Sequence, residues 1–157
     1  MTIYQNRGNY IAGTWHPVSP QEAEGEIERR NPAALDEVTF RFSYQADAVG
    51  HAVQAAKDAA LLWRQCTLED RIDYLQRIKA VLTKHREELA CAIAYEAGKP
   101  LWEARTEAKA LCAKIDIMAT QGLSYTQSFQ PENLVQGHCV FRPLGVGAVL
   151  CPFNFPL

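Results

Sequence analysis

The central part of the chain repeats apolar residues at the spacing of amphipathic helices. Residues 47–65 form the first predicted helix, because apolar side chains recur every three or four positions along one stripe. That stripe consists of Val49, Ala52, Val53, Ala56, Ala60 and Trp63. Asp47 stands where an N-terminal cap is expected, since a short carboxylate accepts hydrogen bonds from the free backbone N–H groups of a first turn.

Two further helices are predicted from the same kind of spacing. The second begins at Thr67, with Asp70 three residues later in the arrangement of a loose capping box. The residues expected on its buried face are Ile72, Leu75, Ile78, Leu82, Leu89 and Ile93. Gly98 followed by Pro100 is a strong stop signal for this helix. The third helix is predicted over about residues 101–121, so the middle of the chain is expected to hold three helices.

Short strands are predicted on both sides of the helices. Residues 10–15 form an expected strand that is interrupted by a glycine, and Asn31-Pro32 marks a turn. Residues 38–42 alternate apolar and polar side chains, which predicts a half-buried strand. Another strand is expected over residues 135–142. Residues 145–151 are continuously small and apolar, as in a strand that a parallel sheet buries on both faces and that needs neighbouring strands to be stable.

The composition is that of a globular protein with one real core. The chain has 157 residues, of which 48% are hydrophobic and 22% are charged, and its formal net charge is −2. This charge balance argues against a nucleic-acid partner, which usually requires a basic stripe. Apolar runs are shorter than a membrane span needs, and the N-terminus lacks the basic and apolar regions of a signal peptide. We therefore expect no membrane association and a cytoplasmic location.

The cysteines and histidines do not predict a disulfide framework or a metal site. The five cysteines are Cys66, Cys91, Cys112, Cys139 and Cys151, an odd number without a closely spaced pair. The four histidines are scattered and form no metal-binding spacing. Free thiols in a reducing compartment are the expected state, and no metal cofactor is expected.

The most promising chemistry lies in residues 152–156, a proline-bracketed loop that follows the predicted buried strand. Each proline fixes its own φ and restricts the preceding residue, so Asn154 is expected in a stiff loop. Ligands of open α/β sheets bind at the carboxyl ends of strands, and a fixed amide N–H can stabilise a carbonyl oxygen that becomes negative. Taken alone, however, the same five residues could equally be a simple turn beside an aromatic cluster.

Matching stretches along nearly the whole chain resemble the N-terminal part of the NAD(P)-dependent aldehyde dehydrogenase superfamily. In chain order they are Tyr10–Trp15, Asn31-Pro32-Ala33, residues 55–64, Arg71–Leu75, Tyr95–Pro100, Trp102-Glu103-Ala104 with Glu107, Pro143–Val146 and Pro152–Pro156. The commoner family form has Trp at the position of Phe153, and Thr at that of Ala97. The Phe form, with Trp102–Arg105, is similar to the succinylglutamate semialdehyde dehydrogenase branch of arginine catabolism.

The resemblance implies an α/β fold. It corresponds to the N-terminal part of the aldehyde dehydrogenase fold: short N-terminal strands, three helices, an oligomerisation strand and the first strand of a Rossmann-like parallel sheet. Residues 1–157 would be an incomplete N-terminal portion of the cofactor-binding domain, with residues 130–142 in an oligomerisation element. The family oxidises aldehydes to carboxylic acids through a cysteine thiohemiacetal, with NAD or NADP as acceptor. Its full-length members are expected to be homo-oligomers.

The resemblance also assigns roles to individual residues at the end of the chain. Asn154 is implied as the donor that stabilises the oxyanion. The backbone around Leu150, Cys151, Pro152 and Phe153 is implied to border the cofactor. The family's nucleophile and general base lie downstream of this motif, so they are expected to be absent from these residues. Cys151 is not expected to replace the nucleophile, because no cationic partner near it in the sequence would lower its pKa.

Glu96 and Glu103 are expected to be solvated or structural, and Lys99 is expected to be a solvated residue at a helix stop.

Two hypotheses for the function remain open. In the first, the chain is an inactive part of an oxidoreductase whose substrate is a small aldehyde. In the second, it is a noncatalytic interaction module that pairs with full-length aldehyde dehydrogenase subunits through residues 130–142 and an exposed strand edge. Neither hypothesis predicts aldehyde oxidation by the 157 residues alone.

Overall fold

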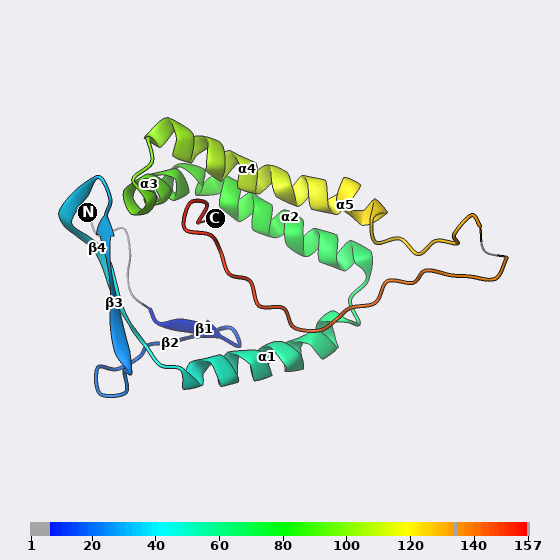
Figure 1. Cartoon of the computed structure of the whole chain (residues 1–157), viewed down its shortest axis with the longest axis horizontal. Helices are drawn as coiled ribbons and strands as arrows, with labels where there is room; N and C mark the ends of the chain where they lie inside the picture. Colours follow the sequence, from blue (N-terminus) through cyan, green and yellow to red (C-terminus); the bar gives the residue numbers. More distant parts are fainter. Residues whose placement is uncertain (1–6, 134, 157) are drawn as a thin grey trace.

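Two β-hairpins precede a group of helices, and a long irregular segment follows them. The computed structural model describes residues 7–133 and 135–156. The first hairpin pairs β1 (Asn9–Ile11) with β2 (Thr14–His16), and the second pairs β3 (Gly25–Asn31) with β4 (Ala34–Tyr44). Figure 1 shows helices α2 to α4 as one layer, with α1 and the first hairpin on the opposite side of the C-terminal residues.

The first hairpin corrects the prediction of a single strand over residues 10–15. Ala12 and Gly13 both have positive φ, at 50° and 83°, so the chain reverses between two three-residue strands. Two consecutive residues of positive φ are typical of the tight hairpin turns that match strand twist. The prediction was wrong because the glycine makes the turn here instead of interrupting a strand.

The second hairpin confirms the other two N-terminal predictions. The chain turns directly after Asn31, between the end of β3 and the start of β4. The expected strand over residues 38–42 lies inside β4, which is longer at both ends. The Asn31 side chain fixes this turn, because its Oδ1 accepts a hydrogen bond from the backbone N–H of Ala33 at 2.9 Å.

Helices α1 (Asp47–Trp63) and α2 (Leu68–Lys84) begin differently. Asp47 lies in the first turn of α1, and the N-cap residue is Ala46, so the predicted aspartate cap is wrong. The predicted capping box of α2 is confirmed. The backbone N–H of Asp70 donates to Thr67 Oγ1 at 3.1 Å, and the backbone N–H of Thr67 donates to Asp70 Oδ2 at 2.9 Å. The backbone N–H of Thr67, and the Thr67 hydroxyl at 2.8 Å, donate to the Asp70 carboxylate and lower the pKa of this carboxyl.

The expected continuous second helix is broken at His85. Its φ of −98° and ψ of 14° end α2 and begin α3 (Arg86–Ala97). The break redirects α3 so that it packs against α4 (Leu101–Ala119). The described core lies at this contact and consists of Ala90, Ile93, Ala104 and Ala108. The break was not predicted because the apolar period continues through it.

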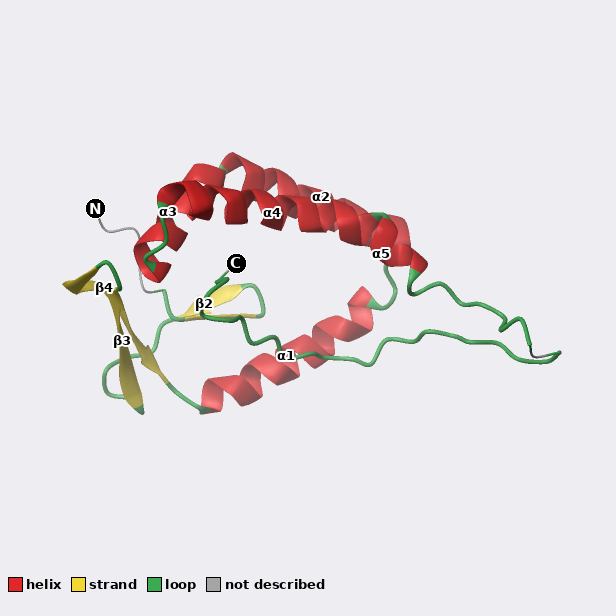
Figure 2. Cartoon of the chain, turned by 45° about the horizontal axis from the view of Figure 1, so that its top comes forward, coloured by secondary structure: helices red, strands yellow, loops and turns green. Residues whose placement is uncertain are grey.

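The other predicted helix bounds are confirmed with small shifts, but the predicted buried face of the second helix is wrong over α2, which has no buried residue and leaves Ile78 50% exposed. Gly98 adopts a left-handed φ of 67° directly after α3, and Pro100 precedes the first residue of α4. The third predicted helix corresponds to α4 followed by the short α5 (Gln121–Ser124). Figure 2 shows α4 and α5 following one another along the layer that also contains α2.

The two strands predicted near the end of the chain are not formed. Over residues 135–142 the structure has a single bridge between Phe129 and Cys139, and residues 145–151 pair with no strand among the described residues. Leu150 is 94% exposed. A strand is stabilised by hydrogen bonds to a neighbour, so apolar sequence alone does not produce one. Figure 1 shows residues 126–133 reaching away from the helices and residues 135–144 returning toward them.

The corner at Gly98 yields a stability prediction. An added Cβ would lie 3.0 Å from Pro32 Cβ, and the left-handed φ is strained for any L-residue with a Cβ. We expect Gly98→Ala to lower the free energy of unfolding by about 1–2 kcal/mol. Urea unfolding followed by circular dichroism measures this change.

Gly50→Ala is the matched control, because Gly50 lies in α1 with nothing within 4 Å of an added Cβ. The helix propensity of alanine should raise the free energy of unfolding by about 0.5–1 kcal/mol there. Equal effects of the two substitutions would contradict the account of the corner.

Candidate functional site

The tip, defined here as residues 152–156, forms a tight turn. The backbone N–H of Phe155 donates to the carbonyl oxygen of Pro152 at 3.3 Å, which places Phe153 and Asn154 at the centre of the turn. The Asn154 side chain is exposed and forms no hydrogen bond within residues 7–133 and 135–156. No described residue therefore accepts a hydrogen bond from its side-chain amide.

One side of the tip lines a cleft of about 580 Å³. The other walls are the β3–β4 hairpin and the end of α3. The lining residues are Glu28, Arg29, Arg30, Pro32, Glu96, Ala97, Cys151, Pro152, Phe153 and Pro156. Three of the four predicted cofactor-bordering positions are thus brought to one cleft, whereas Leu150 and the predicted catalytic residue Asn154 lie outside its lining. That they border a cofactor remains a prediction.

The charges of the hairpin wall are largely neutralised. Glu28 forms ion pairs with Arg30 and Arg41, and Arg41 Nε donates to its carboxylate at 2.7 Å. The hydrogen bond from Arg41 is the main reason that the pKa of Glu28 is lowered. Arg29 lines the same cleft and forms no ion pair within the described part of the chain. Its guanidinium is the positive charge of this wall that remains available to a ligand.

The hairpin is fixed to α3 through the carboxylate of Glu37. The Tyr95 hydroxyl donates to Glu37 Oε1 at 2.7 Å, and Asn31 Nδ2 donates to Glu37 Oε2 at 2.9 Å. These two donors, the Tyr95 hydroxyl first, hold the pKa of the Glu37 carboxyl below its ordinary value of 4.5. The carboxylate in turn raises the pKa of Tyr95. This link connects the turn of the β3–β4 hairpin to the end of α3. It therefore holds two walls of the cleft together.

Lys99 contradicts the expectation of a solvated residue. Its side chain is 14% exposed, and its Nζ lies 2.6 Å from Oε2 of Glu107, whose side chain is 6% exposed. The same ammonium lies 4.2 Å from the ring centroid of Phe155. The left-handed turn at Gly98 reverses the chain between α3 and α4, so the side chain contacts α4 and the tip. The sequence analysis did not predict this ion pair, although the opposite charges of Lys99 and Glu107, eight residues apart, could have suggested it.

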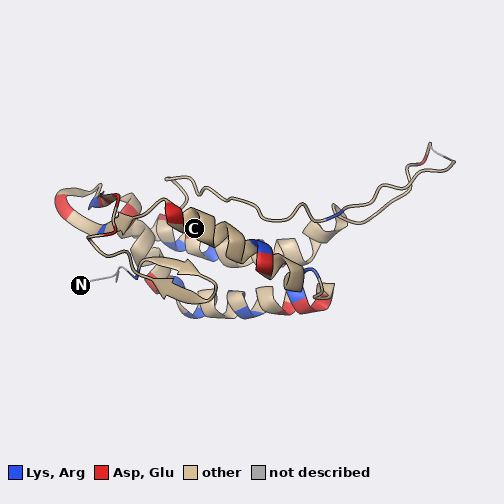
Figure 3. Ribbon diagram, turned by 90° about the horizontal axis from the view of Figure 1, so that it is seen from below, with Lys and Arg blue, Asp and Glu red and all other residues tan. Residues whose placement is uncertain are grey.

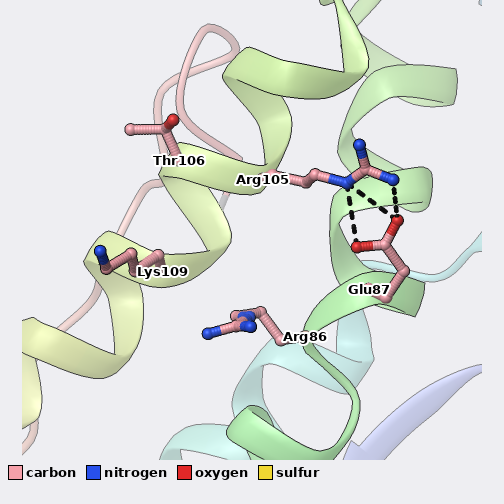
Figure 4. A pocket seen from close by; sticks show the side chains of 5 residues that line it. All are labelled: Arg86, Glu87, Arg105, Thr106 and Lys109. Atoms are coloured by element: carbon pink, nitrogen blue, oxygen red, sulfur yellow. Dashed lines mark hydrogen bonds and ion pairs between the residues drawn. The ribbon is translucent and has the colours of Figure 1, made fainter.

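A second hollow of about 310 Å³ lies where α3 meets α4. Figure 4 shows its side chains, which are Arg86, Glu87, Arg105, Thr106 and Lys109. Arg105 Nε donates to Glu87 Oε1 at 2.9 Å, which lowers the pKa of Glu87. This ion pair joins α3 to α4. We therefore interpret the hollow as a feature of helix packing and not as a ligand site. Figure 3 shows basic and acidic residues interspersed along the helices.

The cysteines are free and lie apart. Cys112 is buried, Cys91 and Cys151 are exposed, and Cys66 and Cys139 are intermediate. Among the described residues, no group of three His, Cys, Asp or Glu side chains is placed to hold a metal ion. Within the same residues, no helix has the length and apolar character that crossing a membrane requires.

Comparisons with known proteins match most of the chain. A family model described as the aldehyde dehydrogenase family matches residues 18–157. An N-succinylglutamate 5-semialdehyde dehydrogenase of Burkholderia thailandensis is 40% identical over 150 residues, which cover 94% of this chain and 30% of that protein. An enzyme of the same name from Hahella chejuensis is 38% identical over 133 residues, which cover 83% of this chain and 27% of that protein.

A solved structure also supports the fold. The 1-pyrroline-5-carboxylate dehydrogenase from Thermus, crystallised with bound NAD, has a TM-score of 0.76 at 28% identity and covers 94% of this chain and 28% of that one. The predicted α/β fold, as the N-terminal part of this architecture, is thereby confirmed. The chain spans less than a third of the length of each of these proteins.

The Glu37 link predicts a pH dependence of stability. Because its pKa is lowered in the folded chain, Glu37 stabilises the fold above pH 4.5, and this contribution is lost as the pH falls through the folded-state pKa. We expect Glu37→Gln to lower the urea midpoint at pH 7 and to reduce the loss of stability between about pH 5 and pH 3.

Glu26→Gln is the control, since it changes an exposed carboxylate on the same hairpin. An unchanged acid dependence in Glu37→Gln would show that the link contributes nothing to stability.

Proposed function

The chain belongs to the aldehyde dehydrogenase family, and we propose that it is the N-terminal part of a subunit that oxidises an aldehyde to a carboxylic acid. NAD or NADP is the proposed hydride acceptor. The observation that carries the proposal is the tip: Pro152, Phe153 and Pro156 line the cleft, and the Asn154 amide on the same turn forms no hydrogen bond among the described residues. Stabilisation of an oxyanion requires a donor that is oriented in advance, and the backbone turn supports this orientation.

Asn154 is the proposed catalytic residue of this part of the subunit. When a thiolate attacks an aldehyde carbon, the carbonyl oxygen becomes negative, and an N–H of the Asn154 amide would donate a hydrogen bond to it. Such a donor is effective because it is oriented before the reaction and need not be reorganised during it. The turn hydrogen bond between Phe155 and Pro152 supports this orientation. The thiolate and the general base are proposed to come from other residues of the longer subunit.

The residues at the end of the chain fit one wall of a dinucleotide site. Pro152 and Phe153 present apolar surface, and Phe153 is 89% exposed. Residues 145–151 carry backbone N–H and C=O groups without a strand partner in the described structure. Apolar surface beside free backbone groups is typical of cofactor sites. We propose that Cys151, Pro152 and Phe153, with Leu150 before them, form this wall, and that the bound dinucleotide accepts hydride.

The proposed substrate is a small acidic semialdehyde. The support is the identity of 38–40% to two proteins named N-succinylglutamate 5-semialdehyde dehydrogenase. Arginine catabolism is the corresponding proposed process, in the cytoplasm and in a homo-oligomeric enzyme. Because the chain spans 27–30% of these two relatives, the substrate is proposed for the longer subunit.

One structural feature favours the alternative of an interaction module. Residues 126–133 and 135–142 form a projecting arm whose two sides are joined by the Phe129–Cys139 bridge. Val135 in this arm is 95% exposed, and Val140 and Phe141 are also exposed. Extended backbone with exposed apolar side chains is a template for pairing with another strand. We propose the arm as an oligomerisation element, whether the chain acts within a longer subunit or alone.

Removal of the Asn154 amide should impair the chemical step. In the full-length subunit we expect Asn154→Ala to lower kcat about 100- to 1000-fold, because one oxyanion donor is lost. Steady-state NADH formation with the semialdehyde measures this effect. Gln21→Ala removes an exposed amide from the segment between β2 and β3 and should leave kcat unchanged. Full activity of Asn154→Ala would refute the proposed role.

The two functional hypotheses differ in what the 157 residues do beside a full-length subunit. We expect the isolated chain to form no NADH, since it holds the proposed oxyanion donor without a nucleophile. If the chain is an interaction module, it should also co-purify with a tagged full-length aldehyde dehydrogenase subunit through the arm. A substitution of Val135→Lys should then abolish the association. NADH formation by the chain alone would contradict both hypotheses.

A further inference from the structure

Lys99 occupies an unusual position for a lysine at a helix stop. It follows Gly98 at the corner between α3 and α4, and its side chain is mostly buried. A buried ammonium needs a partner, because desolvation of an isolated charge is costly. Glu107 is that partner, at 2.6 Å. The pair is therefore formed within the packed corner rather than on the surface.

Glu107 orients the ammonium from one side only. Its Oε2 binds Lys99, while its Oε1 is buried and has no hydrogen-bond partner among the described residues. The position of Lys99 is thus determined by a single short contact to α4. The ammonium also lies over the ring of Phe155, at 4.2 Å from the ring centroid. Lysine over an aromatic face is attracted by the ring quadrupole, here with a ring that is 54% exposed.

Phe155 is a member of the tip and the immediate neighbour of Asn154. Its backbone N–H also closes the turn by donating to Pro152. The Lys99–Phe155 contact therefore joins the corner between α3 and α4 to the one turn that carries the Asn154 amide. Residues 145–151, which lead into the tip, have no strand partner among the described residues, so they do not hold the tip in this way.

We propose that Lys99, oriented by Glu107, is a positioning residue that anchors the tip through the ring of Phe155 and so fixes the backbone that carries the Asn154 side chain. This inference rests on the proposed function for the role of Asn154, whereas the anchoring itself is a structural statement. Lys99 touches neither substrate nor cofactor in this proposal. Its effect passes through Phe155 alone, which makes the two side chains energetically coupled.

The test measures the order of the tip by NMR relaxation of the 157-residue chain. We expect the backbone amide of Asn154 to have an order parameter near 0.85, which is typical of rigid backbone. In Phe155→Leu and Lys99→Met it should fall below about 0.6. Phe155→Leu leaves the Lys99–Glu107 pair intact, so it remains informative if Lys99→Met, which leaves Glu107 unpaired, fails to fold.

Matched variants separate anchoring from general stability. Lys109→Met makes the same chemical change on the exposed side of α4 and should leave the order parameter unchanged. Phe155→Tyr keeps the aromatic ring and should retain the rigid value. Combining Lys99→Met with Phe155→Leu should lower the order parameter no further than either change alone, because both remove one contact.

The proposal is overturned if the parent chain is already flexible at Asn154, or if Phe155→Leu leaves the order parameter unchanged. Its failure is distinct from failure of the proposed function. Loss of order in the tip together with full activity of Asn154→Ala would support the anchoring and refute the catalytic role. In the full-length subunit, Phe155→Leu should lower kcat with little change in KM, since the substrate contacts remain.

Discussion

The left-handed turn at Gly98 is the constraint on which the rest of the structure depends. It lets α3 reverse into α4, so that alanines on both helices form the described core. It also brings Pro32, in the turn of the second hairpin, close to the corner: Pro32 Cβ lies 3.0 Å from where a Cβ on residue 98 would lie. Directly after it, Lys99 is directed to Glu107 and Phe155. A helix pair, a hairpin and the tip therefore meet at one corner.

The buried ion pair at this corner makes the fold sensitive to the loss of either partner. A buried pair recovers little net free energy, because both charges lose their hydration, but loss of one partner typically costs about 3–5 kcal/mol. Lys99 and Glu107 thus disfavour other arrangements of α4 and the tip. The Glu37 link acts similarly on the other wall, where two neutral donors bind one carboxylate. The cleft is consequently fixed on two sides by polar contacts and not by a large apolar core.

Local sequence signals predicted the features that local physics determines. The capping box at Thr67, the stop at Gly98 and the turn after Asn31 depend on a few neighbouring residues, and they were predicted correctly. The break at His85 and the burial of Lys99 depend on packing between α3, α4 and the tip, which the helical period does not reveal. Residues 145–151 have the composition of a buried strand, yet strand formation requires a partner that composition cannot supply. At the candidate site, the sequence predicted the stiff loop of the tip but not the contact between Lys99 and Phe155.

The most direct test of the anchored tip is the chemical shift of the Lys99 ε-methylene protons in the 157-residue chain. Because the ammonium lies over the face of Phe155, the ring current should shift these protons upfield of the values for exposed lysines. The shift should vanish in Phe155→Leu. Lys99 ε-protons at the position of exposed lysines in the parent chain would contradict the account.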